Sequence, residues 1–207
     1  MRQLNIFAST CFPLEFFKTF CPNRVLPSTS FSFNFWLINV TLYKPVNLKR
    51  YASLVHSFSR KLNCKIIFEP GRSIVGNAGI LVSKVEYIKN GTNKKFVILN
   101  AGMNDFMRPA LYDVQHDIIP IKKTSKKIKG VIEFVGPICE STCKFGKYKN
   151  YQKISENDFV AITNVGAYGA SLSSNYNTRP LIAEILVNKN KFKFIRKKQN
   201  LLKLISA

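Results

Sequence analysis

Glycine is missing from the first 70 residues of this chain, and all ten glycines lie at or beyond Gly71. Glycine permits the tight turns and close backbone approaches on which phosphate-binding loops depend. A glycine-rich phosphate cradle is therefore excluded before Gly71. The stretch at residues 27–33 also lacks helical periodicity, so residues 1–43 are anomalous. We expect an irregular, poorly ordered leader or the residue of a damaged reading frame.

Acidic residues are also few. The chain has 11 Asp and Glu against 32 Lys and Arg, a formal net charge of +21. Such an excess often accompanies binding to nucleic acid or anionic membranes. Five lysines lie within residues 122–129 and seven basic residues within 189–203, but neither run carries a known nucleic-acid motif. The many Lys, Asn and Ile residues instead indicate a compositional bias on a solvated surface, so we expect no specific nucleic acid or membrane partner.

Long apolar runs and a disulfide framework are absent as well. No apolar run reaches the length of about 18 residues that a membrane span needs. The N-terminal stretch is interrupted by Pro13, Glu15 and Lys18 and is a poor match to a secretory signal. The five cysteines are an odd number without evident pairing. Reduced thiols in a cytoplasmic protein are therefore expected.

Regular patterns begin near residue 44. Apolar residues between Pro45 and Leu62 recur at spacings of mostly three and four, which predicts an amphipathic helix. A short buried strand is predicted at residues 65–68, directly before the glycine-rich stretch Glu69 to Leu81. Helix, strand and glycine-rich loop in this order are typical of the last unit of a TIM-type α/β barrel. We therefore interpret residues 44–77 as a remnant of a barrel end.

The remaining chain reads as strands separated by turns. Six runs rich in β-forming residues are predicted to be strands, at residues 79–88, 95–100, 128–135, 158–165, 180–187 and 191–195. Strands without intervening helices favour an antiparallel sandwich or barrel. The predicted fold class is therefore mainly β, with residues 78–207 forming a C-terminal β domain.

Four short blocks place polar groups after apolar runs. They are EPGR at residues 69–72, NDFMRPALY at 104–112, GPICES at 136–141 and GAYG at 166–169. The four blocks in this order, with the longer stretches RPALYDVQHDIIP and GAYGASLSSNYNTRP, resemble the C-terminal half of diaminopimelate decarboxylases. These enzymes use pyridoxal 5'-phosphate and consist of an alanine racemase-like α/β barrel followed by a β domain. The resemblance runs from about residue 44 to residue 202.

The resemblance implies a cofactor side of the site. It places Glu69 near the pyridine ring, where a carboxylate keeps the ring nitrogen protonated so that the ring accepts electrons. Gly71 and Arg72 offer close backbone approach and a bidentate anion fork, suited to a phosphate or a substrate carboxylate. Tyr168 corresponds to a tyrosine that lies against cofactor and substrate. By itself Tyr168 is equally compatible with a core aromatic residue.

The resemblance also implies a substrate side. Arg108 and Tyr112 would hold the distal carboxylate of diaminopimelate, Glu140 would pair with its distal ammonium, and Arg72 and Tyr168 would also meet substrate. Cys139 corresponds to the proton donor, a role that suits a thiol because its pKa lies close to working pH. Without the family, Cys139 also reads as a structural thiol. No metal site is expected, since Cys139 and Cys143 have no nearby pair to complete a zinc set.

The family's Schiff-base lysine, stacking histidine and glycine cluster have no counterpart here, because Lys18 and Lys44 lie outside any matching context. We therefore expect a truncated or split decarboxylase that converts meso-diaminopimelate to lysine with a barrel-bearing partner chain or as a homodimer. The resemblance implies a site between subunits, with the Cys139–Glu140 block reaching the partner's barrel. The alternatives are an inactive β module with a basic binding surface and, less favoured by Arg108 and Tyr112, a decarboxylase of another basic amino acid.

Overall fold

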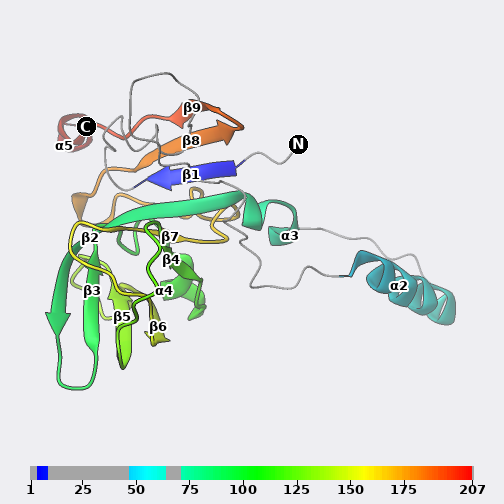
Figure 1. The fold of residues 1–207 in the computed structure, drawn as a ribbon. Helices are drawn as coiled ribbons and strands as arrows, with labels where there is room; N and C mark the ends of the chain where they lie inside the picture. Colours follow the sequence, from blue (N-terminus) through cyan, green and yellow to red (C-terminus); the bar gives the residue numbers. More distant parts are fainter. Residues whose placement is uncertain (1–3, 9–46, 64–70, 207) are drawn as a thin grey trace.

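The computed structural model describes residues 4–8, 47–63 and 71–206, and strands dominate these residues (Figure 1). The strands are β1 (Leu4–Ala8), β2 (Gly79–Asn90), β3 (Lys95–Leu99), β4 (Ile118–Pro120), β5 (Val131–Val135), β6 (Lys144–Lys149), β7 (Phe159–Ile162), β8 (Ala183–Asn188) and β9 (Lys191–Arg196). The helices are α2 (Leu48–Leu62), α3 (Arg72–Val75), α4 (Arg108–Tyr112) and α5 (Leu201–Ile205), with 3₁₀ turns η2 (Gly76–Ala78) and η3 (Tyr176–Thr178). The predicted mainly β class is confirmed.

The strands form one curled, mixed sheet organised around β2. Its main path runs in the order β6, β5, β3, β2, β1, β8 and β9, and β7 joins both β2 and β4. The first part of β2 pairs with β1 and β7, and its second part pairs with β3. Strand β2 therefore links the two lobes of strands seen above and below it in Figure 1.

Two strand pairs depart from the expected antiparallel arrangement. Strand β1 runs parallel to β2, and β3 runs parallel to β5, whereas the other pairs are antiparallel. Parallel neighbours need a long connection between them, which the chain supplies between β3 and β5 with α4 and β4. The prediction of antiparallel strands is therefore wrong for β3 and β5, and no strand was predicted at β1.

The core lies inside the curl of the sheet. Its largest cluster comes from β2, β3, β5, β6 and β7 together with the loops that join them, and it includes the fully buried Phe106, Phe134 and Phe145. A smaller cluster around Ile80 and Ile185 covers the opposite face of β2 and β8. Both faces of the first part of β2 are thus buried, which explains its unbroken apolar run.

Helix α2 confirms the predicted amphipathic helix, with a later start. Asn47 caps it, because its side-chain oxygen accepts a hydrogen bond of 3.1 Å from the Arg50 backbone N–H. Asn63, with a left-handed φ of 46°, ends it. No residue of α2 is buried, and the helix lies apart from the sheet (Figure 1).

All six predicted strand runs contain a strand, whereas β1, β4 and β6 were not predicted. Residues 1–43 were expected to be irregular, yet Leu4–Ala8 pairs with both β2 and β8. Strand β6 has exposed lysines at three of its six positions, whereas Phe145 is buried and Tyr148 is partly buried against the core. The predicted strand at residues 65–68 lies outside the described residues. The division into segments ending at residues 43 and 77 stays a prediction.

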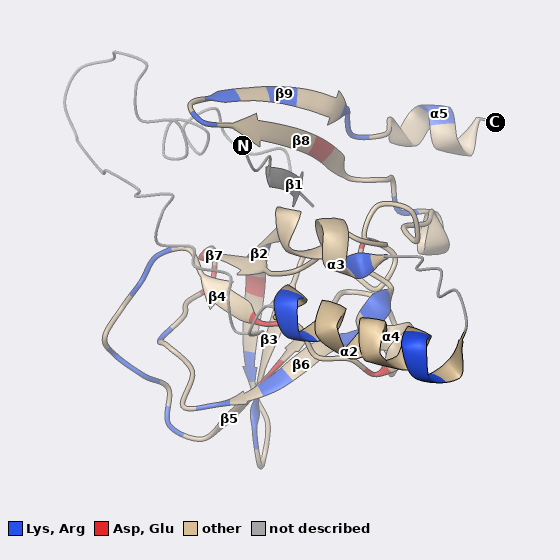
Figure 2. Cartoon of the chain, turned by 90° about the vertical axis from the view of Figure 1, so that its right-hand side faces the viewer, with Lys and Arg blue, Asp and Glu red and all other residues tan. Residues whose placement is uncertain are grey.

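The basic residues are spread over several parts of the molecule. Figure 2 shows Lys and Arg on the connection between β4 and β5, along α2 and on β9. The described Lys and Arg residues are thus carried by several separate elements. Across residues 4–8, 47–63 and 71–206, no helix is long and apolar enough to cross a membrane.

Candidate active site

Gly71 and Arg72 lie where the chain enters the sheet. Gly71 precedes α3, and its carbonyl accepts a hydrogen bond of 3.1 Å from the Ile74 N–H. The Arg72 guanidinium Nη2 donates to the Asn164 carbonyl at 2.6 Å, which ties the start of α3 to the loop after β7. Glu69, the residue expected at the pyridine ring, lies outside the described residues.

Arg108 and Tyr112 are the first and last residues of α4, and their spacing of four places them on one helical face. The guanidinium carbon of Arg108 lies 5.2 Å from the centre of the Tyr112 ring and 5.9 Å from that of Tyr168. These distances are within the range of cation–π attraction. Arg108 is half-buried, and its Nε is buried without a hydrogen-bond partner among the described residues.

Tyr168 brings the loop after β7 to the same place. Its φ of 64° is left-handed, a conformation that non-glycine residues seldom adopt. A Cβ atom placed on Gly71 would lie 3.1 Å from the Tyr168 hydroxyl oxygen, so the two residues are close neighbours. We call Gly71, Arg72, Arg108, Tyr112 and Tyr168 the arginine–tyrosine group.

His116 lies beneath this group. It is buried, and its ring packs edge-on against Phe106 at a centroid distance of 4.7 Å. Burial, together with the charges of Arg72 and Arg108, lowers the pKa of His116 to about 4, although the hydrogen bond to Thr163 opposes this shift. Its Nδ1 lies 2.9 Å from the Thr163 carbonyl, which only accepts, so Nδ1 carries the proton and donates. His116 is therefore a neutral, buried residue at neutral pH.

Cys139 and Glu140 lie in the loop between β5 and β6, and both are exposed. Cys143, four residues on, is buried and accepts a hydrogen bond of 3.4 Å from the Met103 N–H. The contact recorded for Glu140 is with the phenol of Tyr176, not with the arginine–tyrosine group. We call residues 139–141 the thiol–carboxylate loop.

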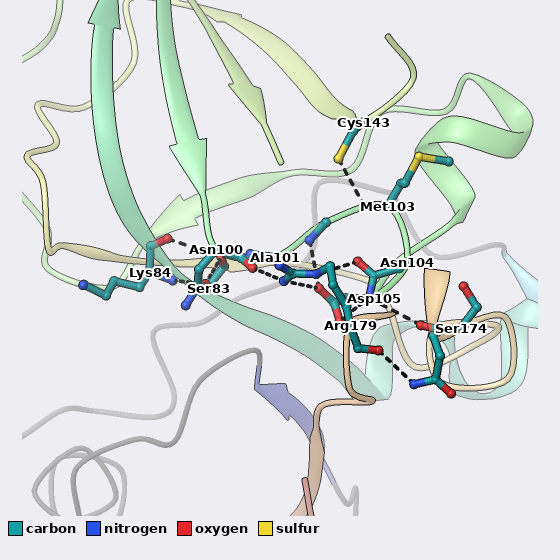
Figure 3. A network of polar contacts seen from close by, with 12 residues as sticks. Ser83, Lys84, Asn100, Ala101, Met103, Asn104, Asp105, Cys143, Ser174 and Arg179 are labelled. Carbon is teal, nitrogen blue, oxygen red and sulfur yellow. Dashed lines mark hydrogen bonds and ion pairs between the residues drawn. The ribbon is translucent and has the colours of Figure 1, made fainter. Parts of the chain in front are cut away.

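A polar network joins Arg179 to the segment at residues 100–105 (Figure 3). The Arg179 guanidinium donates to the Asn100 carbonyl at 2.6 Å and to the Asn104 side-chain oxygen at 3.1 Å. It also lies 3.5 Å from Asp105, whose carboxylate accepts from the Gly102 N–H at 2.8 Å. Burial raises the pKa of Asp105, although the Gly102 N–H and Arg179 oppose this shift. The network fixes the segment that leads directly into Arg108.

Two features of this region were missed from the sequence. Tyr176 and Arg179 lie in the quoted stretch GAYGASLSSNYNTRP, but nothing in their spacing marks a contact with Glu140 or Asp105. An arginine before proline reads as a surface charge. Within the described ranges, no group of three His, Cys, Asp or Glu is placed to hold a metal ion.

The fold and these loops have known counterparts. Residues 9–166 match the family model described as pyridoxal-dependent decarboxylase, C-terminal sheet domain. Diaminopimelate decarboxylase of Zymomonas mobilis is 41% identical over 157 residues, which is 76% of this chain and 37% of that protein. The chain thus spans little more than a third of that relative's length.

Solved structures of diaminopimelate decarboxylases also match this chain. A crystal structure of diaminopimelate decarboxylase from Helicobacter pylori complexed with L-lysine matches with a TM-score of 0.67 and 38% identity, over 82% of this chain and 41% of that one. The enzyme from M. jannaschii in complex with L-lysine matches with a TM-score of 0.66 and 36% identity, over 75% and 36% of the two chains. The resemblance drawn from the four sequence blocks is confirmed. The chain belongs to the family of pyridoxal-dependent decarboxylases, whose cofactor is pyridoxal phosphate, and carries that family's C-terminal sheet domain.

Proposed function

We propose that this chain contributes the substrate-binding and proton-donating side chains for decarboxylation of meso-diaminopimelate to lysine. The observation that carries the proposal is the environment of Arg108. Its guanidinium lies near the rings of Tyr112 and Tyr168 and keeps a buried Nε without a partner among the described residues. A buried, unsatisfied donor on a charged group is costly unless a ligand completes it. A carboxylate is the ligand that a guanidinium fork fits.

The arginine–tyrosine group also fits one side of a cofactor site. Gly71 has no side chain, so the Tyr168 hydroxyl approaches its backbone closely. We assign Glu69, Gly71, Arg72 and Tyr168 to the cofactor, with Arg72 and Tyr168 also meeting substrate. When bound, pyridoxal phosphate supplies an electron-accepting ring for the electrons of the carbon–carbon bond that breaks.

The remaining assignments concern the substrate. Arg108 and Tyr112 hold its distal carboxylate, which orients the amino acid with its other end toward the cofactor. Glu140 pairs with the distal ammonium. Cys139 gives a proton to the carbon that loses carbon dioxide, and its exposed position in a short loop leaves the thiol accessible to a substrate.

The exposed face of α2 supports a barrel-bearing partner. Its apolar side chains include Leu48, Leu54 and Leu62, each more than half exposed at 74%, 55% and 63%. An apolar helix face of this size is normally covered. We propose that it packs on the α/β barrel of a partner polypeptide or subunit, and that the thiol–carboxylate loop reaches a second copy in a dimer.

Reconstitution tests this function. The 207-residue chain is co-expressed with the barrel part of the Zymomonas mobilis relative, and carbon dioxide release from carboxyl-labelled meso-diaminopimelate is measured. We expect release that requires both polypeptides and pyridoxal phosphate, with ornithine a poor substrate. Arg108→Met should lower kcat/KM for diaminopimelate by about 100-fold, because a bidentate charged contact is lost.

Tyr87→Phe is the matched control, since Tyr87 is an exposed residue of β2 outside both groups. It should leave the rate unchanged. If no mixture binds pyridoxal phosphate or releases carbon dioxide from diaminopimelate, the proposal fails.

A further inference from the structure

Tyr176 makes a contact with Glu140 that has no role in the proposed function. Its phenol O–H donates a hydrogen bond to Oε1 of Glu140, although the two residues are 36 positions apart in the sequence. That hydrogen bond raises the pKa of Tyr176, and the charge of Glu140 and the proximity of Cys139 raise it further. Tyr176, Glu140 and Cys139 are therefore immediate neighbours. The other carboxylate oxygen of Glu140, Oε2, has no recorded protein contact among the described residues.

The backbone that carries Tyr176 is strained. The next two residues, Asn177 and Thr178, both have a φ of 55°, in the left-handed region. Asparagine tolerates this conformation, but a β-branched threonine rarely adopts it. Strain of this kind persists only where the surroundings hold it, and it concentrates at functional sites.

Contacts on both sides hold the strained pair in place. Before it, the Asn175 side-chain amide donates to the Arg179 carbonyl at 2.8 Å, which closes the turn. After it, the Arg179 guanidinium is fixed by Asn100, Asn104 and Asp105 (Figure 3). The turn at residues 175–179 is therefore anchored to the buried segment at residues 100–105.

The residues that flank the thiol–carboxylate loop contact the same segment, residues 100–105. The Met103 N–H donates to the Cys143 sulfur at 3.4 Å, and the Thr142 hydroxyl lies 3.6 Å from the Met103 sulfur. A Cβ atom on Gly136, three residues before the loop, would lie 2.8 Å from the Ala101 carbonyl oxygen, so the backbone leading into the loop also packs tightly there. The hydrogen bond between Tyr176 and Glu140 therefore joins two loops that are both anchored to residues 100–105.

We infer that Tyr176 is a positioning residue that holds the Glu140 carboxylate in one orientation beside Cys139. Oε1 accepts from the phenol, and Oε2 stays available to a primary ammonium group of the ligand. The inference rests on the proposed function, in which Glu140 meets the distal ammonium of the substrate. It adds a residue that fixes which carboxylate oxygen faces that ammonium.

The first test needs neither cofactor nor partner. Tyrosines of the 207-residue chain are labelled with ¹³C at the ring carbon bonded to oxygen, and the Tyr176 signal is identified by its loss in Tyr176→Phe. In the unaltered chain the Glu140 carboxylate disfavours the phenolate of Tyr176, and Glu140→Gln removes this charge. We therefore expect Tyr176 to lose its proton at a higher pH in the unaltered chain than in Glu140→Gln. Tyr87 in the same spectra is the internal control and should not respond. Equal titration of Tyr176 in both chains overturns the inference.

The second test uses the reconstituted mixture. Tyr176→Phe should lower kcat/KM for diaminopimelate by about 10-fold, mainly through KM, because an unfixed Glu140 binds the ammonium less well. A mixture that is inactive with the unaltered chain refutes the proposed function while the titration still decides the Tyr176 contact. An active mixture in which Tyr176→Phe matches the unaltered chain overturns the positioning role.

Discussion

The buried His116 shows how one side chain reports on its surroundings. Its pKa falls to about 4 in the folded chain, from about 6.5 for an exposed histidine. Between these values the unfolded chain binds a proton at this ring that the folded chain does not. The free energy of unfolding should therefore decrease as pH falls through this window, by up to about 3 kcal/mol, and be fully retained above it.

Urea unfolding at pH 7, 6, 5 and 4 measures this dependence. His116→Gln should lose the part due to the imidazole, and the difference between the two curves removes the opposing contribution of Asp105, whose pKa is raised. His56, the other histidine, is exposed on α2, so His56→Gln should keep the full dependence. Parallel curves for the unaltered chain and His116→Gln would contradict the expectation.

Single residues were predictable from the sequence where their partners are local. Arg108 and Tyr112 were assigned to one site by the resemblance, and their spacing of four puts them on one face of α4, although this helix itself was not predicted. The contact between Tyr176 and Glu140 joins residues 36 positions apart, and that of Arg179 with Asp105 joins residues 74 apart. Such pairs are set by how the loops fold back on the sheet, which no short pattern encodes.

At the scale of elements, Gly166 links the loop after β7 to the start of β2. A Cβ atom there would lie 2.1 Å from the Val75 carbonyl oxygen and 2.8 Å from the Gly79 nitrogen, and both are backbone atoms. Gly166→Ala should therefore force these segments apart and lower the free energy of unfolding by about 3 kcal/mol.

Gly130→Ala is the comparison variant for this prediction. Gly130 has a φ of +90° but nothing within 4 Å of an added Cβ, so only backbone strain of about 1 to 2 kcal/mol is expected. Urea denaturation of both variants gives the two losses. A loss for Gly166→Ala no larger than that for Gly130→Ala would show that the loop yields easily.

The strands were predictable to the extent that one face is polar or the run is continuously apolar. Strand β2 was predicted because its first half is a continuous apolar run, which is buried in the structure. Strand β4 has three residues and ends in Pro120, so it is too short to show an alternation of apolar and polar residues. Strand β1 lies in a glycine-free, aromatic-rich segment whose pattern gave no sign of its two partners, because both are far along the chain.

For the whole molecule, the uncovered face of α2 has a measurable effect. We expect the isolated chain to self-associate through this face, because exposed apolar surface is favourably removed from water. Leu54→Glu should reduce the association seen by sedimentation velocity and weaken binding to the barrel polypeptide. Leu54 is 55% exposed, so the helix itself should tolerate the change.

Ser53→Glu makes the same change in charge at the neighbouring position, away from the apolar face. It should leave both association and barrel binding as in the unaltered chain. If the unaltered chain and both variants sediment as monomers and bind the barrel equally, the face of α2 is not an interface.

The place of β1 in the sheet bears on how the chain folds during synthesis. Strand β1 lies between β2 and β8, so β8 and β9 reach the rest of the sheet through it. Its partner β8 ends at Asn188, near the other end of the chain. The ribosome thus releases β1 and its partner β2 long before β8 exists, and contacts this distant in sequence form slowly. We expect the edge of β1 that pairs with β8 to stay unpaired until translation is nearly complete, which makes the closing of this sheet a late event.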